Sequence, residues 1–294
     1  MLSHLGEIAA LGTAFSWSFG SIFFTFASRQ IGAFMVNRLR LTIAFSFIII
    51  THYLIFGRLS PLASSFSWFW LGLSGLIGFT IGDTLLFRAF VLLGPRLTML
   101  VMSLVPVFGS ILARIFLNET LSQAKILAIL ITLFGITWAI GKRNGGRPTN
   151  YRFGIISALG AAFCQALGLF ASKKGLGNNL SPISGNLIRV LVGTTTLWLF
   201  PLFWRNLGKT FKKLQNRNIF LPLLGGAIFG PFLGVGLSLI AIQRTKIGIA
   251  STLMALPPVI LIPLSRWIFK ERISLSAILG TIISFLGVAL IFLL

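Results

Sequence analysis

The sequence predicts an all-α integral membrane protein, with ten transmembrane helices arranged as two inverted-topology repeats of five helices each. Three observations lead to this prediction. The composition is too apolar for a soluble protein, the chain divides into ten apolar runs of spanning length, and one long stretch occurs twice. The duplication also relates positions that are far apart in the chain, which narrows the search for a functional site.

The composition leaves too little polar surface to cover a water-soluble globule. Hydrophobic residues make up 56% of the 294 residues, the mean hydropathy is +0.96 and only 10% are charged, against about a quarter in soluble domains. The chain is therefore expected in the cell membrane as a multi-pass protein in contact with the lipid bilayer. The net charge of +21 comes from basic residues between the apolar runs, where Lys and Arg anchor helices against anionic lipid rather than bind nucleic acid.

A membrane span needs about 20 apolar residues, and ten stretches of roughly that length follow one another. A helix satisfies its own backbone hydrogen bonds in lipid, so each stretch is predicted as a helix. The predicted spans are Leu5–Ala27, Ile31–Phe56, Trp68–Leu93, Arg96–Leu117, Leu121–Gly141, Phe153–Ser172, Ile183–Trp204, Ile219–Gln243, Ile247–Phe269 and Leu275–Leu293. A basic, glycine-rich linker, 144–151, separates a first half, 1–143, from a second half, 152–294.

The chain contains an internal duplication. Residues 78–119 align without a gap on residues 230–271. The alignment pairs Gly78 with Gly230, Gly82 with Gly234, Met102 with Met254, Pro106 with Pro258, Arg114 with Arg266, and Glu119 with Glu271. Each half holds five predicted spans, and because five is odd, the second half enters the membrane from the opposite side. Inverted repeats of this kind are typical of secondary transporters, whose substrate site lies between the repeats near the bilayer midplane.

Four features of the halves are shared with a known family. They are an aromatic first span (Ala14-Phe15-Ser16-Trp17), an arginine near the start of spans two and seven (Arg40 and Arg189), a proline within spans four and nine (Pro106 and Pro258), and a short turn containing glutamate (residues 118–122 and 270–274). Each half thus resembles an EamA domain of the drug/metabolite transporter superfamily. The resemblance implies a ten-helix, basket-shaped transporter with a central cavity, often an exporter of amino acids or other metabolites. It does not specify the substrate, because the superfamily carries very different solutes.

Asp83 is the first candidate for a functional site, because it is an acidic residue near the middle of span three. A carboxylate at that depth is costly unless it is paired, protonated or in contact with water. Arg88 is excluded as its partner, since five residues along a helix separate two side chains by about 140°. A partner from another span, such as Arg38 or Arg40, is expected. Asp83 either couples protons or binds a substrate amine, or it forms a structural ion pair; its counterpart in the second half is Val235.

Other polar and adaptable side chains are candidates for substrate binding in a central cavity. Arg40 and Arg189 either bind an anionic group or extend toward lipid headgroups. Trp17 and Gln165 occupy matching positions of spans one and six; the alternatives to a place in the cavity wall are packing for the tryptophan and an interhelical hydrogen bond for the amide. Small polar and methionine side chains before the prolines suit either an adaptable cavity wall or helix packing; these are Met99, Met102 and Thr252.

Structural hinges are predicted at two pairs of matching positions. Pro106 and Pro258 interrupt the backbone hydrogen bonds inside spans four and nine. Glu119 and Glu271 lie in the tight turns that follow, close in sequence to basic residues, namely Arg114, Lys125, Arg266 and Arg272. A structural role in each helical hairpin is the expectation for both glutamates.

No pattern of residues supports catalysis. The two His, one Cys and four carboxylates are too scattered for a metal site, for paired acid/base carboxylates or for a nucleotide-binding loop, so no metal or cofactor is expected. The sequence favours a secondary-active permease or exporter of small metabolites, such as amino acids or drug-like amphipathic solutes, working by alternating access. A membrane-embedded enzyme, a lipid-handling scaffold and a channel are the alternatives. Ten helices suffice for a complete cavity in a monomer, and a dimer is also compatible with the sequence.

Two arguments about orientation disagree. The loops on the face opposite to the termini carry most of the basic residues, including the segment 205–217. By the positive-inside rule, both termini then lie outside the cell. The family resemblance implies instead that both termini lie in the cytoplasm. A C-terminal reporter that fluoresces only in the cytoplasm distinguishes the two arrangements.

Overall fold

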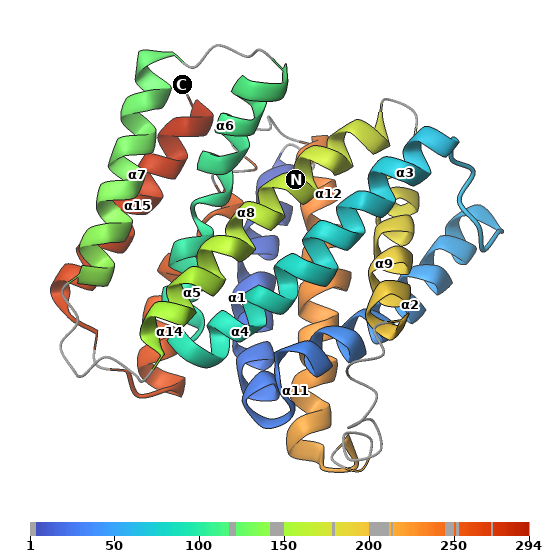
Figure 1. Ribbon diagram of the computed structural model, residues 1–294, viewed down its shortest axis with the longest axis horizontal. Coiled ribbons are helices and arrows are strands. Elements are labelled where there is room, and N and C mark those ends of the chain that lie inside the picture. The colour runs from blue at the N-terminus through green and yellow to red at the C-terminus, as the bar shows by residue number, and fades with distance from the viewer. Residues whose placement is uncertain are drawn as a thin grey trace.

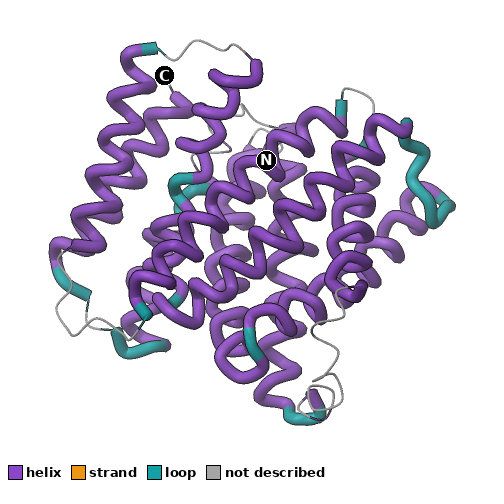
Figure 2. The backbone as a smooth tube through the Cα atoms, viewed as in Figure 1, coloured by secondary structure: helices purple, strands orange, loops and turns teal. Residues whose placement is uncertain are grey.

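The computed structural model describes residues 4–117, 122–141, 150–177, 180–199, 212, 214–244, 250, 253–271 and 273–293. Every regular element within these residues is a helix (Figure 2). Among them, seven helices are long and apolar enough to cross a membrane: Leu5–Ile31, Ala33–Phe56, Ser65–Leu93, Pro95–Phe116, Gln123–Ile140, Tyr151–Leu176 and Arg217–Ser238. The prediction of an all-helical, multi-pass membrane protein is therefore confirmed.

The elements follow the predicted spans in order. Those of the first half are α1 (Leu5–Ile31), α2 (Ala33–Phe56), α3 (Ser65–Ser74), η2 (Gly75–Gly82), α4 (Asp83–Leu93), α5 (Pro95–Met102), α6 (Val105–Leu117) and α7 (Gln123–Gly141). Those of the second half are α8 (Tyr151–Leu176), α9 (Pro182–Leu199), α11 (Arg217–Ala227), η4 (Ile228–Gly234), α12 (Val235–Arg244), α14 (Pro257–Ile268) and α15 (Leu275–Leu293).

The helices present apolar side chains to their surroundings and bury polar ones. Large side chains on the outer faces include Leu54 and Trp267, which are 77% and 82% exposed. Inside the fold, α1 buries Thr13, Ser18 and Thr25 completely. Each of these hydroxyls donates to a backbone carbonyl one turn earlier in α1, so burial leaves no donor unpaired. An apolar exterior over a partly polar interior suits a protein surrounded by lipid.

The third predicted span is a continuous rod in which a π-helical segment, η2, joins α3 to α4. The second half repeats the arrangement, because η4 joins α11 to α12 at the matching position of the duplication. Gly78 lies in η2 and Gly230 in η4, and Pro231 additionally removes a backbone donor from η4. Glycine and proline weaken the regular α-helical hydrogen bonds, and a π-turn accommodates one more residue than an α-helical turn does. Asp83 and Val235 are the first residues after the two π-segments.

The fourth predicted span contains two successive helical elements, α5 and α6. Gly94, with φ at +82°, turns the chain from α4 into α5, a conformation that glycine adopts at little cost. After α5 the chain makes a short turn, and α6 begins with Pro106 in its first turn. In the second half, Pro258 likewise lies in the first turn of α14. Both prolines therefore begin a helix, where a missing N–H costs least, and their role as hinges stays a prediction.

The first helix of each half packs against the third span of the other half. α1 lies along α11, η4 and α12, whereas α8 lies along α3, η2 and α4 (Figure 1). Glycines allow the close approach at matching positions. A Cβ on Gly20 would lie 3.4 Å from the nitrogen of Gly230, and a Cβ on Gly168 would lie 3.1 Å from the Cα of Gly78. The two contacts are therefore equivalent. Each pairs a glycine in the first helix of one half with a glycine in the π-segment of the other half.

The last helices of the two halves, α7 and α15, pair with one another at one edge of the molecule (Figure 1). A Cβ on Gly135 would collide with the backbone nitrogen of Ser284, and a Cβ on Gly287 would collide with the backbone nitrogen of Thr132. These contacts are again reciprocal between matching positions. The two backbones therefore touch, as small residues permit in lipid.

Candidate functional site

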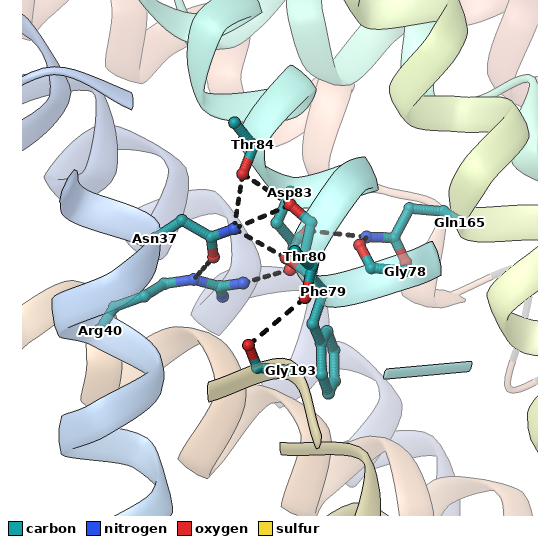
Figure 3. Close-up of polar contacts among 9 residues, drawn as sticks. All are labelled: Asn37, Arg40, Gly78, Phe79, Thr80, Asp83, Thr84, Gln165 and Gly193. Carbon is teal, nitrogen blue, oxygen red and sulfur yellow. Dashed lines mark hydrogen bonds and ion pairs between the residues drawn. The ribbon is translucent and has the colours of Figure 1, made fainter. Parts of the chain in front are cut away.

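Asp83 is the first residue of α4, directly after the π-segment η2, and is only 4% exposed. Its Oδ2 forms an ion pair with Nη2 of Arg40, from α2. Its Oδ1 accepts a hydrogen bond of 2.7 Å from Nε2 of Gln165, from α8 (Figure 3). The carboxylate therefore joins three helices, two from the first half and one from the second. Arg40 is one of the two arginines that the sequence offered as partners.

The Arg40 side chain is held in one orientation by its surroundings. Its Nε donates to Oδ1 of Asn37 at 3.1 Å. Its guanidinium lies 5.3 Å from the ring centre of Phe24 and 4.8 Å from that of Phe87. Aromatic faces attract a cation, and more strongly where water is excluded. The arginine is 5% exposed and does not extend toward lipid headgroups, which corrects that alternative for this residue.

Asn37 connects α2 to the junction between η2 and α4. Its Nδ2 donates to the carbonyl of Phe79 at 2.7 Å and to Oγ1 of Thr84 at 2.9 Å (Figure 3). On the other side of the junction, Oγ1 of Thr80 donates to the carbonyl of Gly193, in α9, at 3.3 Å. The π-segment is therefore fixed by side-chain hydrogen bonds to both α2 and α9, and these bonds set the position of Asp83.

Arg189, on α9, lies beside this network without joining it. A Cβ on Gly78 would lie 3.9 Å from both Nη2 of Arg189 and Oε1 of Gln165. The guanidinium stands 4.5 Å from the ring centre of Phe79. Its Nε is buried and has no hydrogen-bond partner among the described residues. Two arginines thus lie near one carboxylate, and Arg40 alone forms an ion pair with it.

Among its described residues, the second half has no equivalent network at the matching place. Val235 begins α12 where Asp83 begins α4. Trp17, the counterpart of Gln165, packs on the π-segment η4 instead: a Cβ on Gly234 would lie 2.6 Å from its Cδ1 and Nε1. Among the two predicted wall residues of the first helices, Gln165 reaches Asp83, while Trp17 makes an apolar contact between α1 and η4.

The other sequence candidates do not gather at Asp83 as one group. Met99 packs against the cluster that contains Phe24 and Phe87, next to Arg40. Met102 belongs to a different cluster, formed mainly by α5, α7 and α8. Thr252 and Glu119 lie outside the described residues.

Arg38 does not partner Asp83, nor does it reach the lipid headgroups. It is completely buried, and its Nε and Nη2 both donate to the carbonyl of Leu197, at 3.1 and 2.8 Å. Its guanidinium lies 5.1 Å from the ring centre of Phe34 and 4.9 Å from that of Trp198. The arginine ties α2 to the last turn of α9, where backbone carbonyls lack helical partners.

Glu271 is paired with an arginine that the sequence did not suggest. Nε of Arg96, at the start of α5, donates to Oε2 of Glu271 at 3.2 Å. Arg96 belongs to the other half of the chain, so this ion pair joins the two halves. The carboxylate lies against the corner at Gly94, because a Cβ there would be 3.0 Å from its Oε1.

Glu271→Gln and Arg96→Gln are expected to show a coupling free energy on the order of 1 kcal/mol in a double-mutant cycle, because the pair is only partly shielded from solvent. The measurement is unfolding of the purified protein in mixed micelles. The matched cycle pairs Glu271→Gln with Arg266→Gln, an exposed arginine five positions away, and should give no coupling. Equal coupling in the two cycles would show that the Arg96 contact is unimportant.

Asn37 is the member of the Asp83 network that sequence reasoning missed. The signal was available, because Asn37 precedes Arg40 by three positions and Asn186 precedes Arg189 by three. Three positions place two side chains on one helix face. Within the described residues, no group of three His, Cys, Asp or Glu residues could hold a metal ion.

Comparisons with known proteins agree along most of the chain. The EamA-like transporter family matches residues 4–141 and again residues 152–293. A protein of Archaeoglobus fulgidus, described as an uncharacterized transporter, is 23% identical over 218 residues, which cover 74% of this chain and 75% of that protein. A solved crystal structure whose description names no function superposes with a TM-score of 0.66 at 19% identity, covering 97% of this chain and 95% of the other. At that identity the likeness shows a shared fold.

Proposed function

Because the chain belongs to the EamA-like transporter family, we propose that it is a secondary-active transporter of the cell membrane. It moves small metabolites, such as amino acids or drug-like amphipathic solutes, by alternating access around a site between its two halves. The observation that carries this proposal is the buried network of Asp83, Arg40 and Gln165. The network spans both halves and lies directly at a π-helical interruption of the third span.

The reciprocal contacts support two inverted repeats of five spans each. Gly12 approaches Leu237 and Gly160 approaches Leu85 at 3.2 and 3.1 Å from the added Cβ, and the members of these contacts match in the duplication. A two-fold relation between the halves produces such exchanged pairs, as it does in symmetric dimers. An odd number of spans per repeat makes that axis lie in the membrane plane, which is the design of many secondary transporters.

Because the network connects the two halves, its position favours a role in the movement of transport over a purely structural role. Gln165 belongs to the second half and Arg40 to the first, so any displacement of one half against the other changes the contacts of Asp83. Ionisable groups within a membrane are costly and mark substrate or proton pathways. π-helical segments are frequent at functional sites. In this proposal, the solute or a proton exchanges with one of the partners of Asp83 during the transport cycle.

Asp83→Asn is expected to reduce solute flux driven by a pH gradient by at least tenfold, because the neutral amide can neither hold Arg40 nor exchange a proton. The measurements are flux driven by a pH gradient and, separately, counterflow, both in proteoliposomes with a panel of amino acids, sugars and amines. Counterflow also separates a carrier from a channel, which gives no counterflow. Arg88→Gln is the control, since Arg88 is an exposed side chain of the same helix.

The two roles of Asp83 give different results in this assay. If Asp83 couples protons, Asp83→Asn retains counterflow and loses only the response to a pH gradient. If the carboxylate contacts the solute, both activities are lost together. Unchanged flux under both conditions would sink the assignment of Asp83.

A further inference from the structure

The two halves carry the same pair of polar residues in different states. In the first half, Oδ1 of Asn37 accepts from Nε of Arg40. In the second half, the corresponding atoms are Oδ1 of Asn186 and Nε of Arg189. Both are buried, and neither has a hydrogen-bond partner among the described residues. A buried polar atom without a partner costs about 1–3 kcal/mol, so two at matching positions need a cause.

The second half lacks an acid where the first half has one. Asp83 neutralises Arg40, whereas Val235 stands at the matching position in the second half. Asp83 lies within electrostatic reach of Arg189, but its two oxygens are taken by Arg40 and Gln165. The site therefore holds two guanidinium groups and one carboxylate, which leaves one positive charge uncompensated.

The guanidinium of Arg189 lies against an aromatic ring and forms no ion pair among the described residues. Its face rests on the ring of Phe79, a contact that leaves the N–H groups at its edge free to donate. Gly78 has no side chain to cover Nη2, since even a Cβ there would remain 3.9 Å away. The acceptor Oε1 of Gln165 is equally close to that Cβ position, so a cation and an amide both lie beside Gly78, next to the backbone of Gly168.

We propose that Arg189 binds the carboxylate of an organic monoanion, with Asn186 orienting the arginine, so that the solute supplies the negative charge that Val235 does not. This inference rests on the transport function proposed above and specifies its substrate class. A planar carboxylate matches the fork of a guanidinium in a bidentate contact. One negative charge balances the site, whereas a phosphate dianion exceeds it. A cationic solute finds no free carboxylate among these residues.

The test uses the full chain in lipid nanodiscs and measures its thermal unfolding with matched solutes. The probes are straight-chain monocarboxylates of two to eight carbons and phenylacetate, each compared with its carboxamide and with the amine of the same skeleton. At least one carboxylate should bind tenfold or more tightly than its amide and amine. The proposal is overturned if no carboxylate binds better than its neutral partner, or if methyl phosphate binds more tightly than every carboxylate.

Two variants separate this role from a structural one. Arg189→Gln should abolish the preference for carboxylate over amide, and Arg189→Lys should retain part of it. Because Arg189→Gln removes an uncompensated buried charge, the ligand-free variant should unfold at the same temperature as the parent or higher. A large loss of ligand-free stability would indicate a structural arginine and contradict the proposal. Arg88→Gln removes an exposed positive charge from α4 and should leave the preference unchanged.

The outcomes also distinguish this inference from the transport function. Carboxylate binding without any flux would support the anion site and contradict the proposed transport function. Flux of amines or neutral solutes without carboxylate binding would support the transport function and contradict the anion site.

Discussion

Arg40→Met is expected to lower the free energy of unfolding by about 3–5 kcal/mol, because it leaves the Asp83 carboxylate buried without its counter-charge. The ion pair is almost completely shielded, with both side chains 6% exposed. The double variant Arg40→Met with Asp83→Leu removes both charges and should recover most of that loss, since apolar side chains of similar size replace a buried pair at little cost. Denaturant unfolding in mixed micelles measures all three proteins.

Arg189→Met provides the matched comparison for this prediction. It removes a second arginine from the same region, but one that forms no ion pair among the described residues, so its stability should not fall with that of Arg40→Met. Similar losses for the two single variants would mean that the ion pair with Asp83 contributes nothing specific. A double variant as unstable as Arg40→Met would lead to the same conclusion.

Gly75→Ala should be the second strongly destabilising substitution, and it should lower the free energy of unfolding by about 3 kcal/mol or more. A Cβ at this position would collide with the backbone oxygen of Arg189 and come within 3.0 Å of its Cα. No flexible side chain can move aside there, so α9 must separate from η2. That shift would also displace the guanidinium of Arg189 from Phe79 and weaken carboxylate binding.

Gly109→Ala is the control for Gly75→Ala. Gly109 lies in α6, and an added Cβ would meet nothing within 4 Å. Alanine favours a helix over glycine by about 1 kcal/mol, so this variant should be neutral or more stable. Thermal unfolding in nanodiscs compares the two, and equal effects would argue against close contact between η2 and α9.

Much of the fold follows from the sequence, because spans in lipid depend on length and apolarity. The duplication was also visible, since it aligns glycine, proline and charged residues. The π-segments were not, because an extra residue per turn depends on which backbone acceptor each N–H selects. The exchange of α1 and α8 between the halves is a matter of tertiary packing. The sequence of neither half indicates which of the two third spans its first helix will contact.

At the candidate site, the sequence indicated Asp83 because a carboxylate deep in an apolar run is costly without a partner. The sequence offered two arginines as partners, and the structure shows that Arg40 forms the ion pair. Arg38 looked similar in sequence, but it precedes Arg40 by two positions, and two positions along a helix turn a side chain by about 200°, so Arg38 lies against Phe34 and Trp198 instead. The pairing of Arg96 with Glu271 joins residues 175 positions apart, and local charge patterns carry no information about such contacts.

The packing of α1 has a consequence for how the chain is made. α1 is synthesised before its main neighbours, α11, η4 and α12, which begin at Arg217. During synthesis, α1 therefore waits in the membrane with its buried hydroxyls already bonded to its own backbone, as at Thr13 and Ser18. Self-satisfied donors of this kind let the face of α1 that contacts the second half lie in lipid until that half is made. Assembly of this protein is therefore completed only when the second half packs around a helix that was inserted earlier.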